Sequence, residues 1–71
     1  MNLADKVKYL RTKKGYTQEE LAKLANVSQP SIVAYENGTR KPVVNTIIQL
    51  AKVLGVKPNV LTDDERSVEE K

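Results

Sequence analysis

The segment TQEELAKLANVSQPSIVAYENG, residues 17–38, contains two short amphipathic stretches, each preceded by a hydroxyl residue. Thr17, followed three residues later by Glu20, has the pattern of a capping box at the start of a helix. Ser28 can cap the second stretch, and Asn37-Gly38 can end it in a left-handed conformation. Each stretch is too short to form a stable helix alone in water. The segment therefore predicts two helices, joined by a tight turn, that must pack on each other and on the rest of the chain.

Apolar residues at helical spacing predict three more helices, one before this segment and two after it. These residues are Leu3, Val7 and Leu10 in the first, Ile47, Leu50, Ala51 and Leu54 in the fourth, and Val60 and Leu61 in the last. Gly15 and Gly55 end two of these helices, and Pro58 opens the last. In the second helix we expect Leu21, Ala22, Leu24 and Ala25 to face inward, and in the third Ile32 and Tyr35. No β alternation is present in the sequence, so we expect an all-α fold, a compact bundle of five short helices.

The length and composition exclude several classes of function. With 71 residues the chain has room for one small domain, which we place at residues 1–62, followed by an acidic, disordered tail at residues 63–71. It has no cysteine and no histidine, the commonest metal ligands and general bases. We therefore expect no metal site, no cofactor and no enzymatic activity. No apolar run is long enough to span a membrane, so we expect a cytoplasmic protein.

Charge is distributed unevenly along the chain. Residues 1–57 carry ten Lys or Arg against four Asp or Glu, whereas residues 58–71 carry two against five. A basic body favours an anionic partner such as double-stranded DNA, although a solvated surface on a small helical protein is an alternative. The tail, DDERSVEEK, is either a solvated end or a segment that binds a protein partner.

The third helix, residues 28–37, has an outer face without charged side chains. Small uncharged residues there would allow the helix to enter the major groove of DNA. Gln29 can pair bidentately with adenine, and the methyl groups of Val33 and Ala34 can contact a thymine methyl. The full set that we expect to face bases is Ser28, Gln29, Pro30, Ser31, Val33 and Ala34. The alternative is a neutral helix or one that binds a protein partner.

Polar residues flank this helix at both ends. Gln18 begins the second helix, whose N-terminal amides suit a phosphate oxygen. At the other end, we expect a second stretch of DNA backbone to be held by Asn37, Thr39, Arg40 and Lys41. A solvated turn is the alternative interpretation of residues 39–42.

At these positions the chain resembles the phage repressor and Cro family of helix-turn-helix proteins, the Xre-like transcriptional regulators. The matching residues are Leu10-Arg11, KGYTQEELA (14–22), VS (27–28), YENG (35–38), KP (41–42) and IIQLAKVLGV (47–56). The resemblance covers roughly residues 3–62 and implies a lambda-repressor-like DNA-binding domain.

Several roles of individual residues follow from this resemblance. It implies phosphate contacts at Gln18 and around Asn37, base-facing positions at Ser28, Gln29, Pro30 and Ala34, and an ion pair between Arg11 and Glu36. Two positions depart from the family pattern. Pro30 replaces a residue that is often a hydrogen-bonding one, and Val43 replaces a Ser that would cap the fourth helix. The first departure means that base specificity cannot be transferred directly from the family.

Together these features predict a sequence-specific transcriptional regulator, a repressor that binds an inverted repeat as a homodimer with helix 28–37 in the major groove. Its twofold interface is expected at Ile48, Val53, Val60 and Leu61. The alternative function is an antitoxin or adaptor module whose main role is protein–protein interaction.

Overall fold

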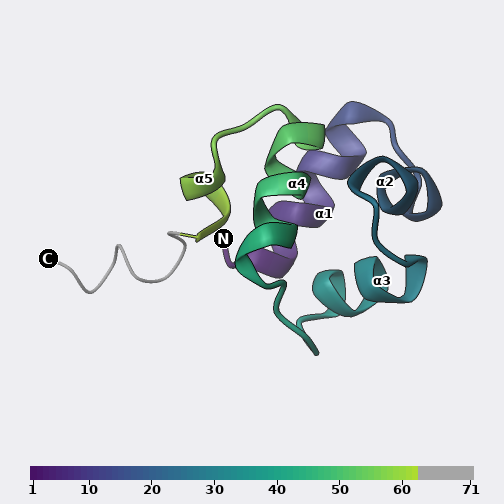
Figure 1. The fold of residues 1–71 in the computed structure, drawn as a ribbon, viewed down its shortest axis with the longest axis horizontal. Helices are drawn as coiled ribbons and strands as arrows, with labels where there is room; N and C mark the ends of the chain where they lie inside the picture. The colour runs from purple at the N-terminus through teal and green to yellow at the C-terminus, as the bar shows by residue number, and fades with distance from the viewer. Residues whose placement is uncertain (63–71) are drawn as a thin grey trace, which may run out of the picture.

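A computed structural model describes residues 1–62, and Figure 1 shows them as five helices. These are α1 (Leu3–Lys14), α2 (Gln18–Ala25), α3 (Gln29–Asn37), α4 (Val44–Leu54) and α5 (Pro58–Thr62). The described part of the chain contains no strand, so the predicted all-α fold of five short helices is confirmed. The acidic tail predicted at residues 63–71 lies outside the described residues. Within residues 1–62 no helix has the length and hydropathy needed to cross a membrane.

Local hydrogen bonds set the ends of the two central helices. At the start of α2, the Glu20 amide donates to Thr17 Oγ1 at 3.0 Å and the Thr17 amide donates to Glu20 Oε1 at 2.8 Å, which completes the capping box. Ser28 caps α3 in the same way by accepting from the Ser31 amide at 3.2 Å. Gly38 ends α3 with a φ of 78°, a left-handed conformation that glycine adopts without steric cost. Helix α2 therefore begins, and helix α3 begins and ends, where the sequence predicts.

The start of α1 and that of α4 differ in how they are capped. Asn2, which the sequence reasoning missed, accepts the Asp5 amide at 2.8 Å and caps α1. Val43, at the start of α4, makes no side-chain capping bond, as expected for a valine at this position.

Each of the five helices contributes one large, fully buried side chain to a single core. These are Val7, Leu21, Ile32, Leu50 and Leu61. Burying such a side chain contributes about 1.5–3 kcal/mol relative to leaving it exposed. All five side chains belong to one cluster, so each helix can bury its apolar face only by packing with the other helices.

Leu24 does not belong to this core, which corrects the expectation for α2. Its side chain is 53% exposed, whereas Leu21 is 0% exposed. At about 100° per residue, Leu21, Ala25 and Ala22 span one arc of the helix, and Leu24 lies about 60° outside it. Helices α3 and α4 pack along α2 and cover that arc, so Leu24 is left on the surface.

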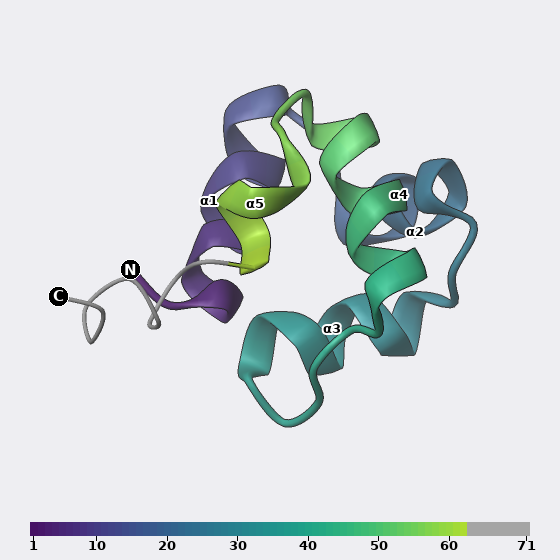
Figure 2. The same cartoon turned by 60° about the vertical axis from the view of Figure 1, so that its left-hand side comes forward.

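Helix α3 lies at the lower edge of the molecule in Figures 1 and 2, where it packs against α1 and α2. The turn between α2 and α3 contains Asn26 with a φ of 61°, a left-handed conformation that asparagine tolerates better than most residues. This arrangement buries Ile32 and Tyr35 and leaves the opposite side of α3 facing outward.

Candidate nucleic-acid interface

The outward side of α3 carries most of the residues predicted to face bases. Ser28, Gln29 and Pro30 are exposed, and Val33 and Ala34 are half-buried. From Ser28 to Tyr35 the segment has no charged residue. A surface helix would ordinarily place Lys and Glu on such a face, so the small uncharged side chains distinguish α3 from a typical solvated helix.

We expected Ser31 to face bases, but the structure buries it, with 9% of its area exposed. It lies one turn before Tyr35 and therefore on the same buried side of α3. Its hydroxyl lies 2.8 Å from Ser28 Oγ and accepts a long hydrogen bond of 3.5 Å from Arg40 Nη2. Ser31 thus connects the cap of α3 to the loop that follows the helix.

The ion pair between Arg11 and Glu36 joins α1 to the last turn of α3. Arg11 Nε donates to Glu36 Oε2 at 2.7 Å and Arg11 Nη2 donates to Glu36 Oε1 at 3.1 Å, in a bidentate geometry. The side chains are 12% and 3% exposed, respectively. A carboxylate in the last turn of a helix faces the negative end of the helix dipole, so Glu36 depends on this partner.

The same carboxylate also contacts α2, a link that the sequence reasoning missed. Gln18 Nε2 donates to Glu36 Oε1 at 3.1 Å, and Arg11 Nη1 donates to the carbonyl oxygen of Tyr16 at 2.8 Å. The structure therefore places Gln18 at the N-terminus of α2, as predicted, with its amide already bonded to α3. No local pattern could have revealed a bond between residues eighteen positions apart.

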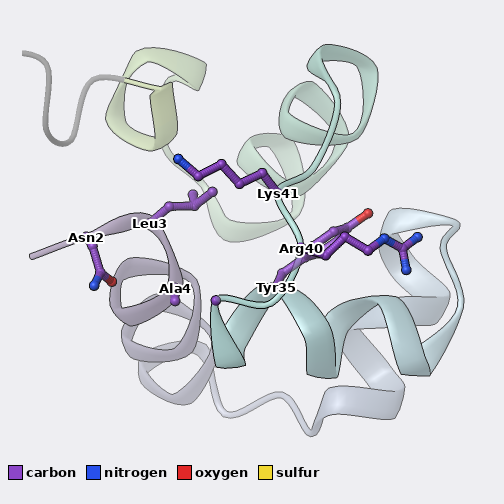
Figure 3. A pocket seen from close by; sticks show the side chains of 7 residues that line it. Asn2, Leu3, Ala4, Tyr35, Arg40 and Lys41 are labelled. Atoms are coloured by element: carbon purple, nitrogen blue, oxygen red, sulfur yellow. The ribbon is translucent and has the colours of Figure 1, made fainter.

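The loop between α3 and α4 carries the other residues expected to contact phosphates. Thr39, Arg40 and Lys41 are all exposed, as is Asn37 at the end of α3. Figure 3 shows the side chains of Arg40 and Lys41 leaving the loop in opposite directions. Lys41 extends toward Leu3 across a pocket of about 170 Å³ that also contacts Asn2, whereas Arg40 extends along α3.

A helix-turn-helix family model matches residues 7–61 of the chain, a range that contains the α2–α3 unit. The chain belongs to this helix-turn-helix family. The match confirms the resemblance to the phage-repressor type that the sequence motifs indicate.

Two relatives match most of the length of this chain. The cryptic phage CTXphi transcriptional repressor RstR of Vibrio cholerae is 35% identical over 69 residues, which are 96% of this chain and 62% of the repressor. The HTH-type transcriptional regulator MJ0272 of Methanocaldococcus jannaschii is 38% identical over 66 residues, which are 89% of this chain and 100% of that protein. The chain thus spans less than two thirds of the length of the phage repressor.

A solved structure of a DNA-bound regulator shows a similar fold. The crystal structure of SinR, the master regulator for biofilm formation from Bacillus subtilis, in complex with DNA, has a TM-score of 0.81 and 27% sequence identity. The similarity covers 86% of this chain and 98% of that chain.

The residues expected at a twofold interface of this helix-turn-helix chain fall into two groups. Ile48 and Val60 are exposed, at 40% and 37% of their area. Val53 is half-buried against the core, and Leu61 is 1% exposed, so Leu61 is a core residue and its assignment to the interface was wrong. Leu61 and Val60 are neighbours on a helix and point about 100° apart, and in α5 Leu61 is the one that faces the core.

Proposed function

We propose that this protein is a sequence-specific DNA-binding transcriptional regulator that represses by occupying its operator, with α3 in the major groove. The observation that carries the proposal is the outward face of α3, exposed and free of charge, with polar and basic side chains at both ends. Membership in the helix-turn-helix family and the structural similarity to SinR in complex with DNA support it. A regulator of this kind works in the cytoplasm, on the nucleoid.

In this proposal the groove-facing residues differ in what they can recognise. Gln29 is exposed in the first turn of α3 and carries both a donor and an acceptor, so it can pair bidentately with adenine. Val33 and Ala34 offer methyl contacts to thymine, and Pro30 contributes shape alone. Gln18, Asn37, Thr39 and Lys41 contact phosphates and fix the register of α3 along the groove.

Replacing Gln29 with alanine should weaken binding to the preferred operator by about 1–3 kcal/mol and relax the preference at one base pair in each half-site. The expected loss arises because the bidentate pair with adenine disappears while the exposed position leaves the fold intact. Fluorescence anisotropy on an operator selected from random DNA, and on its single-base variants, measures both effects.

Gln49→Ala is the matched control, because Gln49 is an exposed glutamine on α4. We expect this variant to bind the operator like the wild-type protein. Unchanged affinity and unchanged base preference for Gln29→Ala would show that Gln29 does not contact a base.

We also propose that two copies bind an inverted repeat through a small apolar surface on α4. Val44 and Ile48 are 69% and 40% exposed and lie one helical turn apart, so they share one side of α4. Binding to an inverted repeat requires the two copies of α3 to lie about 34 Å apart, one helical turn of DNA. Dimerisation also compensates for the weak binding of a single small module.

The Ile48→Lys variant should convert a two-to-one complex with a full operator into a one-to-one complex. A buried lysine at the interface would carry an uncompensated charge, whereas the same side chain in the monomer remains in water. Sedimentation equilibrium at micromolar protein, with and without operator DNA, gives the stoichiometry, and Gln49→Lys serves as a control that adds the same charge to the same helix. A wild-type protein that stays monomeric even on a full operator would contradict the dimer.

A further inference from the structure

We propose that Arg40 determines base specificity by recognising guanine in the major groove, instead of contacting only the DNA backbone as its place in the loop suggests. This inference rests on the proposed function, since it assumes that α3 enters the groove. It assigns to a loop residue a role that sequence reasoning gave only to α3.

The position of the guanidinium group is the first support. Arg40 follows the C-terminal end of α3, yet its side chain extends back along the helix (Figure 3). The guanidinium carbon lies 5.8 Å from the centroid of the Tyr35 ring, and Nη2 lies 3.5 Å from Ser31 Oγ. Ser31 precedes the end of α3 by six residues, or about 9 Å along the helix. The charged group therefore lies beside the N-terminal half of α3, where Gln29 is exposed.

The side of α3 on which Arg40 lies adjoins the groove-facing side. Ala34 is about 60° around the helix from Ser31, and Pro30 is about 100° from it on the same side. Neither Pro30 nor Ala34 has a polar side-chain atom, so on this flank of α3 the only hydrogen-bonding side chain is that of Asn37, at the C-terminal end of the helix. Arg40 supplies a charged donor beside Pro30 and Ala34, which cannot themselves hydrogen-bond to a base.

Two contacts orient the guanidinium and leave most of its donors free. The Tyr35 ring and the Ser31 hydroxyl support it from the protein side, and Ser31 is itself positioned by Ser28 at 2.8 Å. Within residues 1–62 no carboxylate pairs with Arg40. A planar guanidinium that is oriented in advance and has two free N–H groups matches the O6 and N7 acceptors of guanine.

Lys41 provides the contrast within the same loop. Its side chain points away from α3, toward Leu3 and the start of α1 (Figure 3). An ammonium group on a flexible chain acts as a point charge and suits a phosphate rather than a base edge. Adjacent cations in one loop thus have different roles because they lie on different sides of it.

The test is selection of binding sites from random DNA by the full chain, with the wild-type protein and with Arg40→Gln, Arg40→Lys and Lys41→Gln. We expect the wild-type motif to contain one guanine per half-site that both Arg40 variants cease to prefer, with the remaining positions unchanged. Arg40→Lys keeps the charge, so its loss of the guanine preference would separate bidentate recognition from simple attraction to phosphate. On the guanine-containing site Arg40→Gln should bind about 5- to 150-fold more weakly, and on sites with another base there the loss should be much smaller.

Lys41→Gln should instead weaken all sequences alike, leave the motif unchanged and reduce the salt dependence of binding. If Arg40→Gln behaved in this way, or left both motif and affinity unchanged, the specificity role of Arg40 would be refuted while the proposed function stood. If the wild-type protein enriched no motif, the proposed function would fail, and the role of Arg40 with it. Thermal unfolding of each variant is the control for folding, and because both residues are exposed we expect unchanged midpoints.

Discussion

Glu36→Ala should lower the free energy of unfolding by about 3–5 kcal/mol, because it leaves the buried Arg11 guanidinium without its counter-charge. It also removes the acceptor of the Gln18 amide. A domain of this size has a total stability of about 4–11 kcal/mol, so the variant should be close to unfolding at room temperature. Urea denaturation followed by circular dichroism at 222 nm measures the change.

The double variant Arg11→Met/Glu36→Leu distinguishes an unpaired charge from a simple loss of packing. Replacing both partners by apolar side chains of similar size removes the uncompensated charge, so most of the lost stability should return. Glu19→Ala is the control, since Glu19 is exposed in the first turn of α2 and should contribute less than about 1 kcal/mol. A double variant no more stable than Glu36→Ala would mean that the ion pair itself stabilises the fold.

Leu21→Ala should destabilise the domain by about 2–5 kcal/mol, whereas Leu24→Ala should change its stability by less than about 1 kcal/mol. Both leucines lie on α2, but Leu21 is fully buried in the core and Leu24 is 53% exposed. The first substitution leaves a cavity in the core where α2 packs against α3 and α4, and the second removes methyl groups that already contact water. Thermal and urea unfolding of the two variants give the comparison directly.

This pair is internally matched, because the same atoms are deleted from the same helix and the helix propensity changes equally. A difference in stability therefore reports burial alone. Equal losses for the two variants would contradict the placement of α2 against α3 and α4.

Most limits of the helices, though not the Asn2 cap of α1, could be predicted from the sequence because local interactions determine them. The capping box at Thr17, the cap at Ser28 and the glycines at positions 15, 38 and 55 each act within a few residues of the helix end that they set. Such signals do not depend on how the helices later pack, so they can be recognised without a tertiary structure.

The inward and outward sides of the helices were harder to predict. Leu24, Ser31 and Leu61 were each placed on the wrong side, and each lies within about 100° of a correctly placed neighbour. On helices of five to nine residues the apolar pattern contains too few members to fix the angle of the buried arc. That angle is set by which helices pack alongside, and this depends on tertiary structure. The contacts of Arg40 with Tyr35 and Ser31 also depend on tertiary structure. They could not be predicted, because a loop residue belongs to no periodic pattern that would indicate where its side chain points.

Glu36 accepts a hydrogen bond from Gln18 while it is paired with Arg11, and this bond bears on which DNA duplexes the protein prefers. It holds the start of α2 and the end of α3 at a fixed separation, and these are the two places proposed to contact the DNA backbone. A rigid span between two backbone contacts favours duplexes whose groove already has the matching width. Affinity then depends partly on the stiffness of base pairs that no side chain of the protein touches.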